Sequence, residues 1–193
     1  MKKFAHVVLA ACLGIVAGSS WAASTSIERV ALQTNKGTIV IELFADRAPV
    51  TVANFLKYVD AGFYDGLVFH RVIDGFMIQA GGYDANLKPR RPNAPIVNES
   101  KNGLHNIVGA VAMARTNAPD SATSQFFING ADNADLDVIT GKSGYCVFGK
   151  VIGGMDVVQS IAAVQTTFKG SMQDVPIEPV VIESAKRVAP ASP

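Results

Sequence analysis

The sequence predicts a mainly β domain, a sandwich or closed barrel of short strands, with a helix covering each open end. Alternating apolar residues near residue 30 indicate a β-hairpin, and further short apolar runs follow between turn residues. Two segments repeat their apolar residues at helical spacing, so they need an apolar surface to cover, which the ends of a barrel provide. The 193 residues suit a single domain.

The first 22 residues have the pattern of a secretory signal peptide. A short positive head is followed by apolar residues 7–16, and small residues lead up to Ala22. We expect cleavage after Ala22, or at a neighbouring residue, to release a domain of residues 23–193 whose core spans about residues 28–188. Because such a peptide directs export, we expect the protein in the periplasm, with full release from the cell as the alternative.

A lipoprotein signal is the alternative interpretation of this segment. The stretch from Leu9 to Cys12 is similar to a lipid-attachment box, but the apolar region before Cys12 is short and the chain stays apolar through Val16. Removal of residues 1–22 would leave Cys146 as the one cysteine, so no disulfide could form within the domain.

The charge of the chain gives no sign of a polyanionic partner. The formal net charge is +1, and loss of the two signal lysines leaves 15 Lys and Arg against 16 Asp and Glu. Basic residues are scattered apart from Lys88, Arg90 and Arg91, so we expect no nucleic-acid binding. After residue 22 no apolar run reaches the roughly 18 residues of a membrane span, so we expect none.

The first two strands are predicted from a hairpin pattern. Val30 and Leu32 stand at alternate positions before a turn at residues 34–37, and residues 39–43 alternate in the same way after it. The turn contains Asn and Gly, which tight hairpin turns prefer.

Two segments have the spacing of amphipathic helices. The first has Pro49 in its first turn and Gly62 just past its end, and the second follows Gly153 and Gly154. Their apolar residues are Val52, Phe55, Leu56 and Val59 in the first segment, and Met155, Val158, Ile161 and Ala162 in the second.

Short β-like runs account for most of the remaining chain. Gly, Asn, Asp or Pro separates one run from the next, as in sandwiches and barrels. The runs are residues 67–73, 77–80, 96–97, 108–114, 126–128 and 145–151, and residues 176–188 form a returning strand.

One stretch places a cation close to apolar groups. Alternation puts Arg71 on one face of a strand, and a turn at Asp74 and Gly75 leads into a second strand with Met77 and Gln79 on one face. With Ile73 on the same face as Arg71, a hairpin of this kind brings a cation, an amide and two large apolar groups to one surface. A lone arginine in a strand is more often solvated or ion-paired, so this pattern alone does not define a site.

Five segments of the chain resemble the signature segments of the cyclophilin family of peptidyl-prolyl cis-trans isomerases, in the family's order. They are Phe69–Arg71, Gly75–Gly82, Met113–Ala114, Ser124–Ile128 and Val147–Val151. The resemblance covers about residues 28–188, and Asn98 and Glu99 are similar to the bacterial branch. It implies a closed eight-stranded antiparallel β-barrel capped by two α-helices, and an enzyme that accelerates rotation about X-Pro bonds.

The resemblance also implies a role for each site residue. Arg71 matches the catalytic arginine, and Gln79 matches a polar group beside it. The implied substrate-binding residues are Phe76, Met77, Phe127 and Leu136 in the proline pocket, Gln125 as a further polar group, Ala114 and Arg115 through their backbone, and Tyr145 where many members have a histidine. No metal or cofactor is implied, because the reaction breaks no bond.

Asp135 departs from the family pattern. It stands where many cyclophilins have a tryptophan at the pocket edge, a residue associated with binding of the drug cyclosporin. An anionic side chain there should weaken contact with an apolar macrocycle, so we expect weak cyclosporin binding. The loop of residues 138–144 is also longer than in compact members.

The remaining reactive side chains are expected to be structural. No histidine or acid is implied beside Ser124, and His70 and His105 are too isolated to make a metal site. Cys146 lies on a predicted strand and is expected to be a small buried hydrophobe.

The most favoured function is an isomerase that assists the folding of exported proteins, with proline-containing unfolded or partly folded polypeptides as partners and a monomeric state. A proline-peptide-binding adaptor or holding chaperone with little catalysis is the alternative, and Asp135 is the feature that favours it. A barrel that carries a small ligand is a third hypothesis, but large apolar residues along most strands predict a filled interior.

Overall fold

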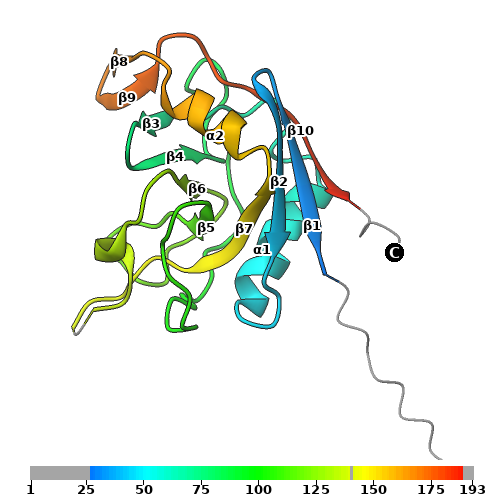
Figure 1. The fold of residues 1–193 in the computed structure, drawn as a ribbon, viewed down its shortest axis with the longest axis vertical. Helices are drawn as coiled ribbons and strands as arrows, with labels where there is room; N and C mark the ends of the chain where they lie inside the picture. Colours follow the sequence, from blue (N-terminus) through cyan, green and yellow to red (C-terminus); the bar gives the residue numbers. More distant parts are fainter. Residues whose placement is uncertain (1–26, 140, 189–193) are drawn as a thin grey trace, which may run out of the picture.

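An eight-stranded antiparallel sheet forms most of the domain in the computed structural model, which describes residues 27–139 and 141–188 (Figure 1). The strand order is β10-β1-β2-β7-β5-β6-β4-β3. Its strands are β1 (Arg29–Thr34), β2 (Gly37–Leu43), β3 (Arg71–Ile73), β4 (Met77–Ala80), β5 (Ala110–Met113), β6 (Phe126–Asn129), β7 (Val147–Gly153) and β10 (Ile182–Val188). The predicted signal peptide lies outside the described residues.

The predicted hairpin is confirmed as β1 and β2. Val30 pairs with Ile41 and Leu32 with Ile39, and all four side chains are fully buried. The alternation seen in the sequence is therefore the alternation between a core face and an outer face.

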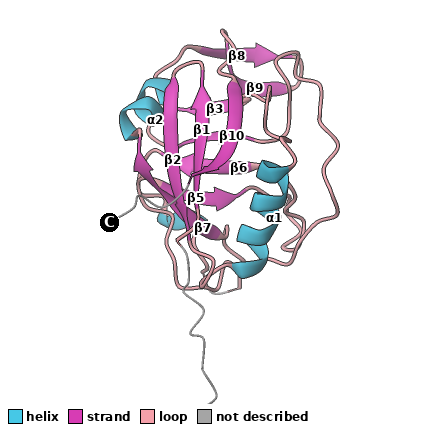
Figure 2. Cartoon of the chain, turned by 90° about the vertical axis from the view of Figure 1, so that its right-hand side faces the viewer, coloured by secondary structure: helices cyan, strands magenta, loops and turns pink. Residues whose placement is uncertain are grey.

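Both predicted helices are confirmed, α1 at Pro49–Asp60 and α2 at Met155–Ala162. The ring of Phe55 lies 5.4 Å from that of Phe126 on β6 and 5.1 Å from that of Phe148 on β7, so α1 fills the inside of the curled sheet. Figure 2 shows the two helices on opposite flanks of β1, β2 and β10. None of the described helices has both the length and the apolar character needed to span a membrane.

The prediction of a closed barrel is wrong, because the sheet curls into an open half-barrel. No strand ladder joins its two end strands, β3 and β10, within the described residues. A single bridge between Val68 and Val181 links the segments that precede them. Pro179 lacks an amide donor and interrupts the predicted strand 176–188, so the β10 ladder begins only at Ile182.

Three further details differ from the predicted elements. Residues 96–97 form one bridge, between Ile96 and Ala122, and no strand. A second, two-stranded sheet was not predicted and consists of β8 (Thr166–Lys169) and β9 (Met172–Pro176). A 3-10 helix at Ala134–Leu136 was also not predicted.

Candidate active site

The candidate site is built on the hairpin of β3 and β4. Arg71 pairs directly with Gln79, and Ile73 with Met77, so the hairpin predicted around Gly75 brings the cation and the amide together. Gly75 has a φ of 67°, which glycine adopts without strain, and its amide donates to the Asp74 carboxylate over 2.9 Å.

A pocket of about 160 Å³ opens beside this hairpin, and we call it the apolar pocket. Its base comes from β4, the end of β5 and β6, and one side comes from the 3-10 helix and the segment before β7. Its lining residues are Arg71, Phe76, Met77, Gln79, Ala114, Arg115, Phe127, Leu136 and Tyr145. The structure thus brings together nine of the ten predicted site residues, and Gln125 lies next to them.

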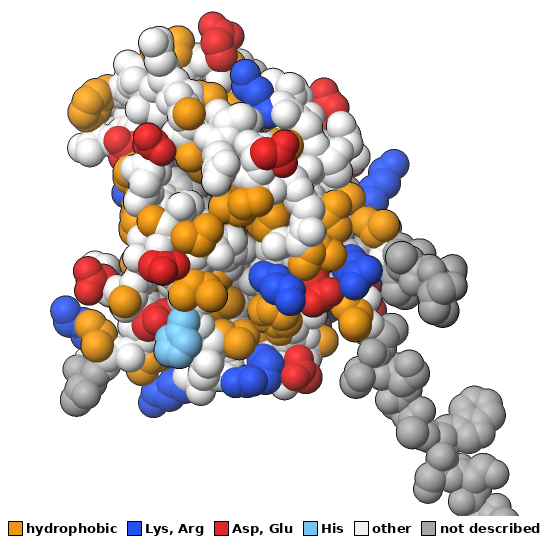
Figure 3. Space-filling view, in the orientation of Figure 1, with side chains coloured by type: hydrophobic (Ala, Val, Ile, Leu, Met, Phe, Trp, Pro, Cys, Tyr) orange, Lys and Arg blue, Asp and Glu red, His pale blue; other side chains and the backbone are white. Residues whose placement is uncertain are grey.

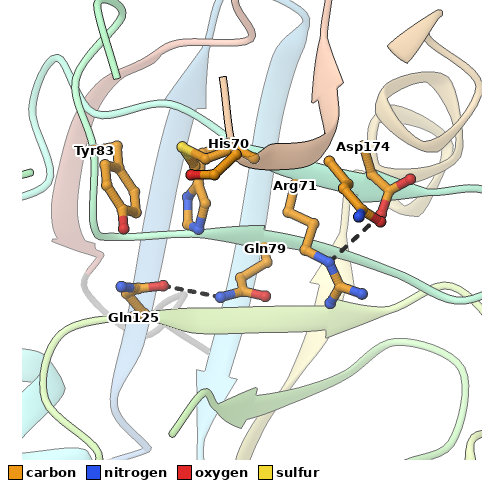
Figure 4. A pocket seen from close by; sticks show the side chains of 9 residues that line it. His70, Arg71, Gln79, Tyr83, Gln125 and Asp174 are labelled. Carbon is orange, nitrogen blue, oxygen red and sulfur yellow. Dashed lines mark hydrogen bonds and ion pairs between the residues drawn. The ribbon is translucent and has the colours of Figure 1, made fainter. Parts of the chain in front are cut away.

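Gln125 contacts the site through Gln79. The Gln79 side-chain nitrogen donates a hydrogen bond of 2.9 Å to the Gln125 side-chain oxygen (Figure 4). This bond fixes both amides in one orientation. Gln125 follows Ser124, whose buried hydroxyl donates to the Gly81 carbonyl over 2.7 Å, so the structural role predicted for Ser124 is confirmed.

The side chain of Arg115 fixes the rim of the apolar pocket, although the family resemblance implies a role for Arg115 only through its backbone, in substrate binding. Its guanidinium lies over the ring of Tyr145, 4.6 Å from the centroid. The same group donates to the carbonyl oxygens of Ser143 and Gly144. Tyr145 also makes an edge contact with Phe127, with ring centroids 5.7 Å apart. The aromatic wall is therefore held from two sides.

Leu136 is positioned by the residue that follows it. The Asp137 carboxylate accepts hydrogen bonds from the backbone and the side chain of Asn106 and contacts His105 Nδ1 at 2.8 Å. Burial acts to raise the pKa of Asp137, but these hydrogen bonds outweigh it and hold the pKa below its usual value. Asp135, on the same 3-10 helix, is exposed.

A second pocket of about 380 Å³ lies on the other side of Arg71 and Gln79, and we call it the hairpin pocket. Residues 171–174 of the β8–β9 hairpin form its outer wall, and His70, Tyr83 and Gln125 complete it. Asp174 places a carboxylate oxygen 3.7 Å from Arg71 Nε (Figure 4). The sequence gives no sign of this partner, since no local pattern links β9 to β3.

Burial shifts the pKa values of two other titratable side chains near the site. The His70 ring is almost completely buried against Tyr83, and desolvation lowers its pKa to about 4, so the ring is neutral at pH 7. Burial likewise raises the pKa of Cys146 to about 11, which keeps the thiol protonated and fits the buried role predicted for it.

This arrangement suits recognition of a small apolar ring beside a polar group. Aromatic and aliphatic side chains grip the ring, and the Arg71 guanidinium offers hydrogen-bond donors at the mouth of the pocket. Gln79 and the backbone at Arg115 can hold a neighbouring peptide group.

Comparison with known proteins supports the same chemistry. Residues 29–187 match the family profile described as cyclophilin type peptidyl-prolyl cis-trans isomerase/CLD. Peptidyl-prolyl cis-trans isomerase A of Dickeya dadantii is 48% identical over 186 residues, which cover 96% of this chain and 98% of that protein. Peptidyl-prolyl cis-trans isomerase B of Escherichia coli is 54% identical over 159 residues, 80% of this chain and 96% of that protein.

Solved structures agree with the sequence matches. A crystal structure of a cyclophilin-type isomerase from Cryptosporidium parvum in the presence of the dipeptide Ala-Pro superposes with a TM-score of 0.70 at 26% identity. The match covers 84% of this chain and 99% of that chain. Profile, relatives and fold together show that the chain belongs to the cyclophilin-type peptidyl-prolyl cis-trans isomerase family and is an enzyme of that class.

Proposed function

We propose that Arg71 is the catalytic residue of this isomerase and that its substrates are X-Pro bonds of exported, incompletely folded proteins. The observation that carries the proposal is the pairing of Arg71 with Gln79 across β3 and β4, at the mouth of the apolar pocket. A proline ring in that pocket would present its nitrogen to the guanidinium.

The chemistry requires stabilisation of a twisted peptide bond. Resonance gives the X-Pro bond a rotation barrier of roughly 18–20 kcal/mol. In the twisted state the proline nitrogen regains a lone pair, which accepts a hydrogen bond from Arg71 that the planar amide accepts poorly. Arg71 then binds the transition state more tightly than the ground state, which is the requirement for catalysis.

The other site residues hold the substrate during this rotation. Phe76, Met77 and Phe127 grip the proline ring, while Gln79, oriented by Gln125, holds the carbonyl on one side of the rotating bond. One end of the bond therefore stays fixed while the other turns.

One observation supports export to the periplasm as the setting of this reaction, the signal-peptide pattern of residues 1–22. Expression of the full chain beside a form lacking residues 1–22 tests this: the full chain should appear in the osmotic-shock fraction, and equal retention of both in the cytoplasm would contradict it.

A proline-binding adaptor with little catalysis is the second candidate function, and exposed Asp135 favours it. An anionic group beside Leu136 weakens apolar contact at this edge of the pocket. We expect weak cyclosporin binding for the same reason, and Asp135→Trp should strengthen it, as measured by calorimetry. Unchanged affinity would show that this position does not contact the drug.

The deciding experiment is the cis-to-trans rate of a short X-Pro peptide with the purified wild-type protein, Arg71→Ala and Arg71→Lys. We expect kcat/KM to fall by about 10²–10³ in Arg71→Ala, the usual cost of a lost transition-state donor. Arg71→Lys keeps the charge but loses the planar fork of donors and should rescue little. Exposed Arg91→Ala is the matched control and should leave the rate unchanged.

The outcomes separate the two candidate functions. Acceleration that collapses only in the Arg71 variants supports the catalytic role. A folded wild-type protein that binds the peptide without accelerating its isomerisation would favour the adaptor.

A further inference from the structure

The hairpin pocket is continuous with the proposed catalytic site. Arg71 and Gln79 line both it and the apolar pocket, and the β8–β9 hairpin closes its far side (Figure 4). With a volume of about 380 Å³, the hairpin pocket has room for a whole side chain. The mechanism proposed above makes no use of this space.

The charges that face the hairpin pocket are already paired. Arg71 and Asp174, the two charged residues that line it, approach each other at 3.7 Å, with side chains about two-fifths exposed. His70 contributes a neutral ring because burial lowers its pKa to about 4. A charged side chain that entered would leave one charge without a partner, whereas an uncharged polar side chain would not.

The hydrogen-bonding groups of the hairpin pocket favour an amide. The Gln79 amide donates to Gln125, and no hydrogen bond among the described residues uses the Gln79 side-chain oxygen or the terminal nitrogens of Arg71. An acceptor, the Gln79 side-chain oxygen, therefore lies beside donors, the terminal nitrogens of Arg71. A carboxamide has the matching set, with one acceptor oxygen and two donor hydrogens.

The backbone of the hairpin supports a functional role for Asp174. Its φ of 58° is uncommon for a residue other than glycine, and such conformations cluster at ligand-binding and catalytic sites. This conformation belongs to the residue whose carboxylate faces Arg71.

We propose that the hairpin pocket is a second substrate subsite, which accepts an uncharged hydrogen-bonding side chain, above all the carboxamide of Gln or Asn, from a residue near the proline. The proposal rests on the proposed isomerase function. An extended chain advances roughly 3.3–3.6 Å per residue, so a residue one or two positions from a proline in the apolar pocket reaches across Arg71 and Gln79.

Matched peptides test the subsite directly. In a set of alanine-based X-Pro peptides, Gln, Met, Glu or Lys stands at one of four positions, the two before and the two after the proline. Two-dimensional exchange NMR measures kcat/KM for each peptide relative to its uncatalysed rate. Gln and Met are similar in size, so their comparison isolates the hydrogen bonds. At one position we expect Gln to exceed each of the others by at least threefold.

Variants of the hairpin show whether that preference comes from the hairpin pocket. Ser171→Trp and Gln173→Trp place a large side chain at exposed positions that line it, and each should reduce the Gln-to-Met ratio to below 1.5. Phe168→Trp, on β8 and 72% exposed, is the matched control and should keep the ratio and the rates of the wild type. Thermal denaturation verifies that all three variants fold.

Two results would overturn the subsite without touching the isomerase function. The first is equal kcat/KM for Gln and Met peptides at all four positions, and the second is a Gln preference that survives both blocking variants. Loss of acceleration for every peptide with the folded wild-type protein would instead contradict the isomerase function itself.

Discussion

The position of the Gln125 side chain depends on the absence of a Cβ atom at Gly82. A Cβ there would come within 2.6 Å of the Gln125 side-chain nitrogen and 2.7 Å of its amide carbon. The obstacle is the end of a flexible side chain, so Gly82→Ala should displace Gln125 and leave the fold intact. The orientation of Gln79 would then be lost with the hydrogen bond from Gln79 to Gln125.

We expect Gly82→Ala to lower kcat/KM about fivefold, since a hydrogen bond of this kind contributes about 1 kcal/mol. Gly153→Ala is the matched control, because a Cβ there meets only Val40 at 3.6 Å. Combination with Gln125→Ala tests the cause: Gly82→Ala should have no further effect in that background, and additive effects would contradict this explanation.

His70 makes the stability of the domain depend on pH. Above pH 6.5 its ring is neutral in the folded and unfolded states, so it adds no pH dependence. Below pH 6.5 the unfolded chain takes up a proton, which the folded state accepts only near its pKa of about 4. The free energy of unfolding should therefore fall as the pH drops from 6.5 to 4, by about 3 kcal/mol in full.

Urea denaturation of the wild type and His70→Phe across this pH range measures the effect. Phe keeps the packing against Tyr83 but cannot titrate, so the difference between the two stability curves should change between pH 6.5 and 4. Parallel curves would show that His70 is not the titrating group.

The sequence was informative about single residues only where a family motif or local pairing defined them. The hairpin around Gly75 was enough to predict that Arg71 and Gln79 meet, and the motif resemblance added Phe127 and Leu136 from distant segments. Asp174 could not be predicted in the same way, because its contact with Arg71 depends on how a separate hairpin packs against the sheet.

Helix α1 lacks a capping side chain of its own. Ala48 stands at the N-cap and offers none, so the first free amides of the helix are bound from a distant loop. The Glu99 carboxylate accepts hydrogen bonds from the amides of Val50 (3.1 Å) and Thr51 (2.8 Å), and from the Thr51 hydroxyl (2.7 Å). Pro49 at the start of the helix needs no amide partner.

Removal of this cap should destabilise the domain. We expect Glu99→Ala to lower the free energy of unfolding by about 1–2 kcal/mol, the usual range for loss of an N-cap. Urea denaturation measures it, with the exposed Glu183→Ala on β10 as a control that should change little. Equal stabilities of the two variants would show that solvent replaces the carboxylate at no cost.

Helix bounds were easier to predict than strand bounds. Pro49 and Gly62 mark the ends of α1, and the apolar spacing between them has the helical period. The β8–β9 sheet gave no such signal, because β8 has no buried residue, with Phe168 72% exposed, and only Val175 and Pro176 of β9 are buried. Short strands that cover little of the core leave no apolar pattern in the sequence.

At the scale of the whole molecule, the sheet has a seam where its two ends meet. The bridge between Val68 and Val181 joins them, with hydrogen bonds from Phe69 to Val180 (2.9 Å), from Ile182 to Leu67 (2.8 Å) and from Gly66 to Ile182 (2.8 Å). Each pair of neighbouring strands within the sheet is joined by a ladder of three or more residue pairs. The predicted closure of the barrel fails at this seam because Pro179, which has no amide donor, delays the start of the β10 ladder to Ile182.

We expect the seam to open without global unfolding. The amides of Phe69 and Ile182 should exchange with solvent at least ten times faster than those in the ladder between β5 and β6, because fewer hydrogen bonds must break. Hydrogen-exchange NMR under native conditions measures both sets. Equal protection would mean that the half-barrel opens only as a unit.

The register of β1 and β10 places Arg29 opposite Val188, so the start of the first strand lies beside the end of the last one (Figure 1). A short linker could join the start of β1 to the end of β10. A circular permutant of the domain could then begin at another surface turn. Positive and negative side chains are scattered over the face shown in Figure 3, without a large patch of one sign. Under mechanical load, a pull on the two ends would break the β1–β10 hydrogen bonds in sequence from Arg29 and Val188 onward, which makes this pair the weak point of the molecule under tension.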